Sequence, residues 1–551
     1  MTATGAVSEL RFPRITLFAV FAVLAVVHTW PLASAPSYYS RLDTADAQLN
    51  TWAMAWVART LPTDPRHLFD AGIFFPEQRT LAYSEPLIVQ GALAIPVLRL
   101  GGSPVLAYNL VLIAGFALTG WAAGLLALRM TGSLLAAIVG GSIAAFNAQS
   151  LVRLPHIQAQ HLEFLPLALY AFDRLLEHGR PKHAVLLGAA VAFQAFASIY
   201  ALIFAAWALA CAAAGRAKEL LGVDRRRNAV LLLGAMGVAA LLLTPVLLPY
   251  YQLSKEYGMT RSVAESRQFA STWTDYFYTG GRLHYWLWSH AFQKSAEANF
   301  PGIVALALAV IGIVAAKHAQ AITRRHVAMA GAIVVGGVLL SVAPWLPGFA
   351  WAHANLPALG AIRAYARAGQ IVMIGLGLLA AAGAIALRGR WISDRTWPVV
   401  AVTLAFLVNA EALRAPMWYS PFEGIPSIYD VLQGSDHTAV LELPIYGRPG
   451  VSRNARYMVN ATRHWKPLVN GYSGFVPPDF GVTARTLNGF PDAASFEWLR
   501  SKGVTTVVLH RSDFQRRKGK RQLALVERSP DLEPRASVGD ITIYLIRERP
   551  H

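Results

Sequence analysis

Long apolar runs divide the sequence, and short links rich in Lys and Arg separate them. Runs such as 15–30, 228–250 and 331–343 contain no Asp, Glu, Lys or Arg. With their flanks they can cross a hydrocarbon layer of about 30 Å, which needs roughly 20 helical residues. The pattern predicts a polytopic α-helical membrane protein with about eleven crossings. The expected spans lie near residues 15–33, 104–128, 131–148, 157–174, 183–198, 200–215, 228–250, 301–316, 327–345, 370–387 and 396–413.

The composition supports this interpretation and excludes a nucleic-acid partner. Of the 551 residues, 55% are hydrophobic and 15% are charged, and the mean hydropathy is +0.40, well outside the usage of soluble proteins. A net charge of +18 would suggest nucleic-acid binding in a soluble chain. Here the cations sit in the links between apolar runs, so membrane topology accounts for them better. The single Cys211 lies in an apolar run and gives no disulfide framework.

The basic links also predict the orientation, because short cytoplasmic links collect Lys and Arg. With the N-terminus inside, the segment 86–98 must not span, and we expect it to lie at the outer interface. The outer side of a bacterial cytoplasmic membrane then holds 36–103, 251–300 and 346–369, followed by everything after 414. A cleaved signal sequence is the alternative for the first apolar run. The links expected inside carry Arg129, Arg174, Arg180, Lys182, Arg216, Lys218, Arg225, Arg226, Arg227, Lys317, Arg324, Arg325, Arg388, Arg390 and Arg395.

The end of the chain changes character. Residues 440–445, 504–510 and 541–546 alternate or cluster β-favouring side chains, and 493–502 has a helical pattern. We therefore expect a membrane domain over 1–415, with its first outer loop at 36–103, and an extracytoplasmic α/β or α+β domain over 416–551.

The first outer loop holds the main candidates for chemistry. Asp43 and Asp46 follow closely on the first span, and Trp52 and Trp56 continue as an apolar edge suited to an interface. A carboxylate held at the membrane boundary can accept the proton of an attacking hydroxyl while a lipid phosphate departs. The alternative is that these Asp residues cap or solvate an ordinary loop.

These features together resemble the GT-C superfamily of polytopic glycosyltransferases. The resemblance rests on an Asp soon after the first span, a long first outer loop, a short polar second outer loop and a C-terminal outer domain. Within the first loop it rests on Asp46-x5-Trp52-x3-Trp56, on Phe74-Phe75-Pro76 and on the run 81–86, Leu-Ala-Tyr-Ser-Glu-Pro. The resemblance covers most of the chain, and within the superfamily it is to a bacterial, largely uncharacterised branch.

The resemblance implies a single-displacement, inverting sugar transfer from a polyprenyl-phosphate or pyrophosphate donor. The acceptor would be a glycan, a lipid or a protein. Asp46 takes the role of the base or acceptor-binding carboxylate, with Asp43 as the fallback, and Glu85 joins the candidate substrate-binding residues. In the last domain, the Gly/Pro-rich loop 470–478 carries Tyr472, whose ring is a further sugar-binding candidate, although a plain turn is the alternative.

The second outer loop departs from the family pattern because Glu163 is its one carboxylate. His156, Gln158 and His161 are expected to hydrogen-bond sugar or phosphate. His156, His161 and Glu163 are also the candidates for a divalent metal, which some relatives use. Their spacing is not a helical i,i+4 pair, and a hard cation prefers more oxygen ligands. No cofactor is therefore assigned.

Three arginines are expected on the outer side near span ends, against the charge bias. Arg153, Arg363 and Arg367 are predicted to bind the donor phosphate, since a guanidinium can grip it through two parallel hydrogen bonds. The alternative is that they reach ordinary lipid head groups.

Two other classes of function stay open. A lipid or solute transporter would place ionisable residues at mid-membrane and show related halves, whereas these spans are nearly devoid of charge. An assembly protein that binds a partner through its last domain would need no carboxylate at position 46.

Overall fold

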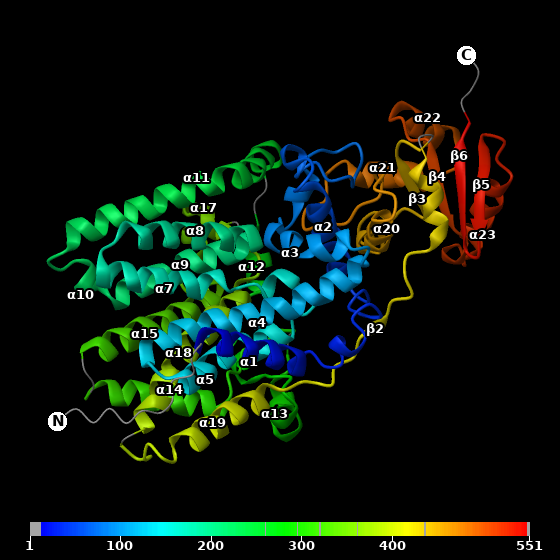
Figure 1. Cartoon of the computed structure of the whole chain (residues 1–551). Coiled ribbons are helices and arrows are strands. Elements are labelled where there is room, and N and C mark those ends of the chain that lie inside the picture. The colour runs from blue at the N-terminus through cyan, green and yellow to red at the C-terminus, as the bar shows by residue number, and fades with distance from the viewer. Residues whose placement is uncertain are drawn as a thin grey trace. The chain divides into compact units, whose positions relative to one another are not determined.

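A computed structural model describes residues 13–258, 261–294, 296–318, 321–360, 362–388, 390–434 and 437–547 (Figure 1). The chain forms two compact units. Unit 1 combines Met1–Ala35 with Leu110–Trp418, and unit 2 combines Pro36–Asn109 with Tyr419–His551. The first outer loop, which was predicted as part of the membrane domain, thus joins the C-terminal residues in one unit.

In the part that the structure describes, every named element of unit 1 is a helix. Its longest helix, α11, packs along α8, and α7, α8 and α9 are in mutual contact (Figure 1). The helices are α1 (Pro13–His28), α4 (Pro104–Thr131, which begins in unit 2), α5 (Leu134–Ala145), α6 (Ala148–Leu151), α7 (Phe164–His178), α8 (Pro181–Ala197), α9 (Ile199–Gly215), α10 (Ala217–Leu220), α11 (Arg225–Tyr257), α12 (Val263–Gln268), α13 (Arg282–Leu287), α14 (Ile303–Ala316), α15 (Ala321–Val342), α16 (Phe349–Asn355), α17 (Pro357–Gly360), α18 (Gly369–Leu387) and α19 (Trp397–Ala412).

Four helical stretches among the described residues are long and apolar enough to cross a membrane. They are Pro104–Thr131, Arg225–Tyr257, Arg324–Trp345 and Tyr365–Leu387. Shorter apolar helices include α1, α5, α9, α14 and α19, together with α3 of unit 2. The membrane class predicted from the apolar runs agrees with these helices, while the count of eleven crossings stays a prediction.

Helix α18 forms the centre of unit 1, where it packs against α5, α14 and α15. Residues 369–384 of this helix are all buried. Small residues allow the helix backbones to approach closely: a Cβ at Gly140 of α5 would lie 2.7 Å from the carbonyl oxygen of Gly377. Such contacts are typical of helices that pack within a membrane, where close van der Waals packing replaces the hydrophobic effect.

A buried group of charges joins four helical segments of unit 1, and we refer to it as the closed ion network. Its centre is Asp173, which accepts hydrogen bonds from Arg129 Nε (2.6 Å), Arg216 Nη1 (2.6 Å) and His326 Nε2 (3.0 Å). Both Asp173 and Arg216 have fully buried side chains. Glu219 binds Arg216 through Nε and Nη2 at 2.6 and 2.5 Å, and Arg325 Nη1 lies 3.2 Å from the same carboxylate. Glu177 also binds Arg129.

Unit 2 is built around α2 (Ala45–Thr60), which packs against α3 (Ile88–Arg99) and α20 (Ala455–Ala461). Helices α2 and α3 approach so closely that a Cβ at Gly91 would overlap the side chain of Val57. The segment predicted at the outer interface is therefore a helix of 12 residues that packs on the first-loop helix.

The C-terminal part of unit 2 contains a four-stranded sheet in the order β3-β4-β6-β5 (Figure 1). Strands β3 (Val440–Leu443) and β4 (Thr506–His510) are parallel, and β6 (Ile541–Ile546) is antiparallel to β4 and to β5 (Leu532–Val538). The three predicted strands are observed, as is the predicted helix, α22 (Ala493–Ser501). The other elements are β1 (Tyr39–Ser40), β2 (Ser420–Pro421), α21 (Phe480–Leu487) and α23 (Arg517–Glu527).

Candidate functional sites

Asp46 lies in the first turn of α2, where the partial positive charge of a helix N-terminus favours a carboxylate. Thr44 caps this helix, with its hydroxyl accepting a hydrogen bond from the amide of Ala47 at 3.4 Å. Asp43 lies just outside the helix and is bound by Arg41, whose Nε is 3.1 Å from Oδ1. The Asp43 carboxylate is therefore already paired with a neighbouring guanidinium.

The structure brings Asp46 together with Tyr472, although 426 residues separate them. The tyrosine hydroxyl donates a hydrogen bond of 2.9 Å to Asp46 Oδ1. Such a bond fixes the direction of the carboxylate. Two residues that were singled out separately, one in the first loop and one in the last domain, thus belong to one site within unit 2.

The loop that carries Tyr472 is held from both sides. On one side, Asn470 exchanges two hydrogen bonds with the backbone of Glu442 on β3, at 2.8 and 2.9 Å. On the other, the amide of Phe74 donates to the carbonyl of Asn470, and the amide of Phe475 donates to the carbonyl of Tyr83. The ring of Phe74 lies so close to Gly471 that a Cβ there would overlap it. The first-loop motifs around Phe74 and Tyr83 therefore support the Tyr472 loop.

Glu85 lies in a small hollow next to α2, together with Asn50, Ser84 and Ser473. Glu85 and Asn50 are both buried. Asn50 lies four residues after Asp46 and so on the same face of the helix. Polar groups that can donate or accept hydrogen bonds therefore gather on the Asp46 side of α2.

Trp52 does not lie on the interfacial edge that was predicted for it together with Trp56. The two indoles stack with their ring centres 6.5 Å apart, and the side chain of Trp52 is buried. Trp56 donates a hydrogen bond of 2.8 Å to the carbonyl of Leu68. Trp52 is therefore part of the core of unit 2, and Trp56 is partly buried beside Trp465, whose ring centre lies 6.0 Å away.

In unit 1, the segment 147–163 and the segment 363–370 are joined by two glutamine side chains. Gln149 donates to the carbonyl of Ala366 at 2.6 Å, and Gln370 donates to the carbonyl of Ala159 at 2.7 Å. Both glutamines are buried. These cross-links bring the second-loop candidates and the two later arginines into one region of unit 1.

The three predicted phosphate-binding arginines lie around His156, and we refer to Arg153, Arg363 and Arg367 as the arginine cluster. Arg153 is largely buried and forms an ion pair with Glu297. Arg363 lies over the ring of Phe269 at 4.6 Å, and its Nε is 3.8 Å from Glu265. Arg367 lies 5.2 Å from the ring centre of Tyr200. Arg153 is thus already engaged by a carboxylate at short range, and Arg363 and Arg367 each lie against an aromatic ring.

The charge of the arginine cluster acts on His156. Burial, followed by the charges of Arg367, Arg153 and Arg363, holds the pKa of His156 well below its ordinary value. The imidazole is therefore neutral and can accept or donate a hydrogen bond. Nearby Gln158 is buried, and its Oε1 has no hydrogen-bond partner in the part of the chain that the structure describes.

The metal candidates do not form a cation site. His161 Nδ1 lies 3.0 Å from Glu163 Oε1, and its Nε2 lies 3.1 Å from the carbonyl oxygen of Val111. Both ring nitrogens thus face protein oxygens, while His156 is surrounded by cations. Among the described residues, no group of three or more His, Cys, Asp or Glu side chains is placed to hold a metal ion.

Several residues at these sites were not anticipated from the sequence. Tyr200 accepts a hydrogen bond from the amide of Arg363 at 3.3 Å and stacks on Arg367. Glu297 and Glu265 supply the negative charge next to the arginines. Tyr200 sits between two apolar runs, and a polar residue at such a junction is the one signal that points to it.

No family model and no curated protein sequence matches the chain. Among solved structures, it is similar to the arabinofuranosyltransferase AftD from Mycobacteria, with 14% identity and a TM-score of 0.61. That match covers 98% of this chain and 40% of AftD, so the chain spans less than half of that protein's length.

Two further similarities have lower scores. ArnT from Cupriavidus metallidurans shares 12% identity, with 96% of this chain and 97% of that chain covered and a TM-score of 0.49. The oligosaccharyltransferase AglB from Archaeoglobus fulgidus shares 12% identity, with 91% and 69% covered and a TM-score of 0.47. The likeness to AftD shows the fold, and the two lower scores support no argument.

Proposed function

We propose that this chain, which has a GT-C-like fold, is a membrane glycosyltransferase that takes its sugar from a polyprenyl-phosphate-linked donor. The acceptor is a hydroxyl group of a glycan, lipid or protein on the outer face of a bacterial cytoplasmic membrane. The observation that carries the proposal is the Tyr472–Asp46 hydrogen bond of 2.9 Å. It places an oriented carboxylate at the start of the first-loop helix in a protein with this fold.

The proposed reaction is a single displacement at the anomeric carbon. Asp46 accepts the proton of the acceptor hydroxyl as the oxygen attacks, and the bond between the anomeric carbon and the phosphate oxygen breaks. The electron pair of that bond leaves with the polyprenyl phosphate. Attack from the side opposite the leaving group inverts the anomeric configuration. Tyr472 donates its hydrogen bond to Oδ1 and so orients the carboxylate that accepts the proton.

The arginine cluster is proposed to bind the phosphate of the donor. The guanidinium groups of Arg363 and Arg367 lie 4.6 and 5.2 Å from aromatic ring centres, and the planar N–H fork of a guanidinium suits a phosphate. His156 is held neutral by burial and by the surrounding cations, so its imidazole can accept or donate a hydrogen bond in this group. Arg153, by contrast, is proposed to position this group through its pair with Glu297.

The test is sugar transfer by the purified chain in reconstituted membranes, with Asp46→Asn as the main variant. An amide keeps the volume but takes no proton, and loss of a general base typically costs ~10²–10⁴ in rate. Asp43→Asn is the matched control, since Asp43 is held by Arg41, and we expect a milder loss. If Asp46→Asn transfers sugar at a rate within a few-fold of the unmodified chain, Asp46 is not the base. That result would favour a non-catalytic role for this loop.

A further inference from the structure

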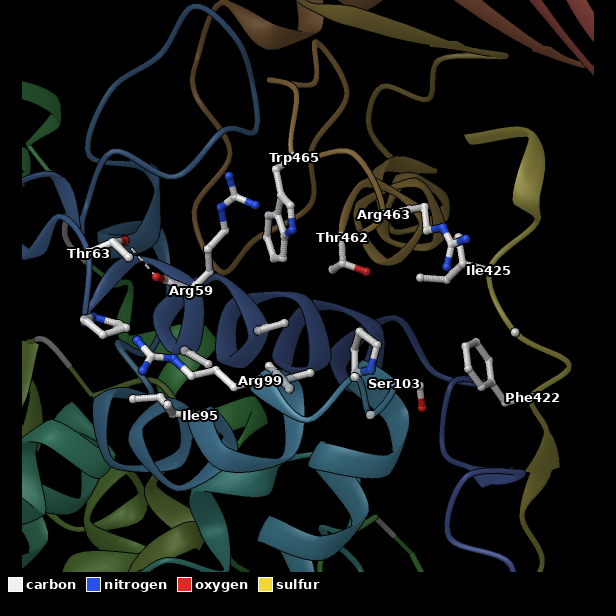
Figure 2. A pocket seen from close by; sticks show the side chains of 18 residues that line it. Arg59, Thr63, Ile95, Arg99, Ser103, Phe422, Ile425, Thr462, Arg463 and Trp465 are labelled. Atoms are coloured by element: carbon white, nitrogen blue, oxygen red, sulfur yellow. Dashed lines mark hydrogen bonds between the residues drawn. The ribbon is translucent and has the colours of Figure 1, made fainter. Parts of the chain in front are cut away.

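A groove of about 600 Å³ runs along the C-terminal half of α2 in unit 2 (Figure 2). The C-terminal half of α3 and the turn after it form one wall, and the segments around Phe422 and Trp465 form the other (Figure 2). Asp46 and Arg59 lie in the first and last turns of α2, roughly 20 Å apart along the helix axis. The groove is therefore separate from the carboxylate site.

The polar lining of this groove is cationic. Arg59, Arg99 and Arg463 line it, and no Asp, Glu, Asn or Gln does. Arg463 is already neutralised, because it donates two hydrogen bonds to Asp430 at 2.6 and 2.7 Å. Arg59 and Arg99 form no hydrogen bond or ion pair through their guanidinium groups with any residue that the structure describes.

The environment of Arg59 favours an anion. Its guanidinium lies 5.2 Å from the ring centre of Trp465, beside which it points in Figure 2. Partial burial lowers the pKa of Arg59, because the charged form loses contact with water and gains no carboxylate. Lys466 adds positive charge where the groove continues past Trp465. His464 adds none, since burial lowers its pKa to about 3.

Apart from the arginines and the hydroxyl groups of Thr63, Ser103 and Thr462, the lining is largely hydrocarbon. It lies next to α4, which is long and apolar enough to cross a membrane. Ile95, Leu98 and Phe422 line the groove, and so does Pro104, the first residue of the apolar helix α4. Beyond the groove, the side chain of Leu100 is 88% exposed. A groove at the start of a span, with apolar side chains leading away from it, suits a molecule with an anionic head and apolar chains.

The lining of the groove fits a lipid phosphate better than a sugar. Sugar hydroxyls need acceptors as well as donors, and carboxylate and amide side chains are the usual acceptors in binding sites. This lining offers guanidinium donors, hydroxyl groups and hydrocarbon. A phosphate on a lipid matches that set, since its oxygens accept the N–H groups of arginine and its chains contact the apolar wall.

We propose that this groove binds the head group of an anionic membrane phospholipid, with Arg59 and Arg99 holding the phosphate. The chains then follow Ile95 and Leu98 along α3. The proposal is independent of sugar transfer. It gives α2, the helix that carries Asp46, a direct attachment to the lipid surface.

The experiment is equilibrium binding of dioctanoyl phosphatidylglycerol to the detergent-solubilised full chain, with dioctanoyl phosphatidylcholine for comparison. We expect saturable binding of the anionic lipid. Each arginine near an anionic lipid surface contributes about fivefold in affinity, so Arg59→Gln with Arg99→Gln should weaken binding roughly 30-fold. Arg66→Gln, on an exposed loop of the same unit, is the matched control and should leave binding unchanged.

A Lys variant and two other anions serve as further controls in the binding experiment. The Arg59→Lys, Arg99→Lys variant keeps the charge and should bind within about fivefold, which separates charge loss from damage to the fold. Binding of inorganic phosphate and of an oligogalacturonate is measured in the same way, because the anion could instead be a free phosphate or an acidic sugar chain. Equal, arginine-dependent affinity for either would overturn the lipid assignment. Absence of saturable phosphatidylglycerol binding, or unchanged binding in the double Gln variant, would overturn it as well.

Discussion

Two groups of charged side chains in unit 1 are built in different ways. In the closed ion network, Asp173 and Arg216 are fully buried, and each guanidinium in the network faces carboxylate oxygens. In the arginine cluster, Arg363 is 38% exposed and lies 3.8 Å from a carboxylate that is itself 29% exposed. Arg363 and Arg367 each lie against an aromatic ring. The first group has its charges matched inside the protein, whereas the second is the group that is proposed to bind the donor phosphate.

The difference teaches how to separate structural from functional arginines in a membrane protein. Both groups lie near span ends and look alike in the sequence, since Arg129 and Arg216 flank apolar runs just as Arg363 and Arg367 do. Their surroundings distinguish them. A buried guanidinium that faces two or more carboxylate oxygens has its charge compensated within the protein, whereas a guanidinium next to an aromatic ring gains no opposite charge from that ring.

The largest effect on stability is expected from Asp173→Asn. Loss of the Asp173 charge leaves Arg216 with Glu219 as its remaining carboxylate partner, and breaking a buried ion pair typically costs about 3–5 kcal/mol. The measurement is thermal unfolding of the purified full chain in detergent. Asp394→Asn is the control, because Asp394 is 74% exposed in its pair with Arg388 and such pairs contribute about 0–1 kcal/mol. Similar losses in both variants would show that the closed ion network has no special structural role.

In the arginine cluster, Arg363→Ala and Arg367→Ala should affect donor binding more than folding. A hydrogen bond to a charged group contributes about 1.5–3 kcal/mol, so the donor KM should rise at least tenfold per variant while the acceptor KM changes little. Lys at either position should rescue poorly, because an ammonium lacks the planar fork. If Lys serves as well as Arg, and neither Ala variant changes donor KM, the arginines only contact lipid head groups.

The smallest effect is a pH dependence that arises from His156. In the unfolded chain this imidazole titrates near 6.5, whereas in the fold its pKa is well below that value. Below pH 6.5 the unfolded chain therefore binds a proton that the folded chain does not. As the pH is lowered, the free energy of unfolding decreases by up to about 1.4 kcal/mol per pH unit. His156→Gln should reduce the drop in melting temperature between pH 7 and pH 5.5. A drop identical to that of the unmodified chain would contradict the assigned environment.

Much of the architecture is readable from the sequence because it depends on local pattern. Apolar runs produce the long helices, and short β-favouring runs produce β3, β4 and β6. Strand β5 was missed because its sequence, Leu-Glu-Pro-Arg-Ala-Ser-Val, is polar and contains Pro534, which an edge strand tolerates at a register shift. Trp52 was misread because an indole suits both an interface and a core, and only its burial in the folded chain decides between them.

The candidate sites were partly readable for a related reason. Asp46 follows from its position after the first span, but its contact with Tyr472 joins residues that are 426 positions apart, and no local pattern encodes that distance. Likewise, Arg363 and Arg367 stand out as cations on the expected outer side. Their ring partners, Tyr200 and Phe269, lie in distant segments and become visible only when the chain is folded.

The most direct test of the central claim is turnover of a polyprenyl-phosphate-linked sugar by the purified chain in sealed vesicles. A panel of donor sugars is supplied with acceptor-containing membrane extract, and both the lipid product and the anomeric configuration of the new bond are determined. We expect one polyprenyl phosphate to be released for each sugar transferred, with inversion at the anomeric carbon. Intact donor that only moves from one side of the vesicle to the other would contradict the claim and identify a transporter instead.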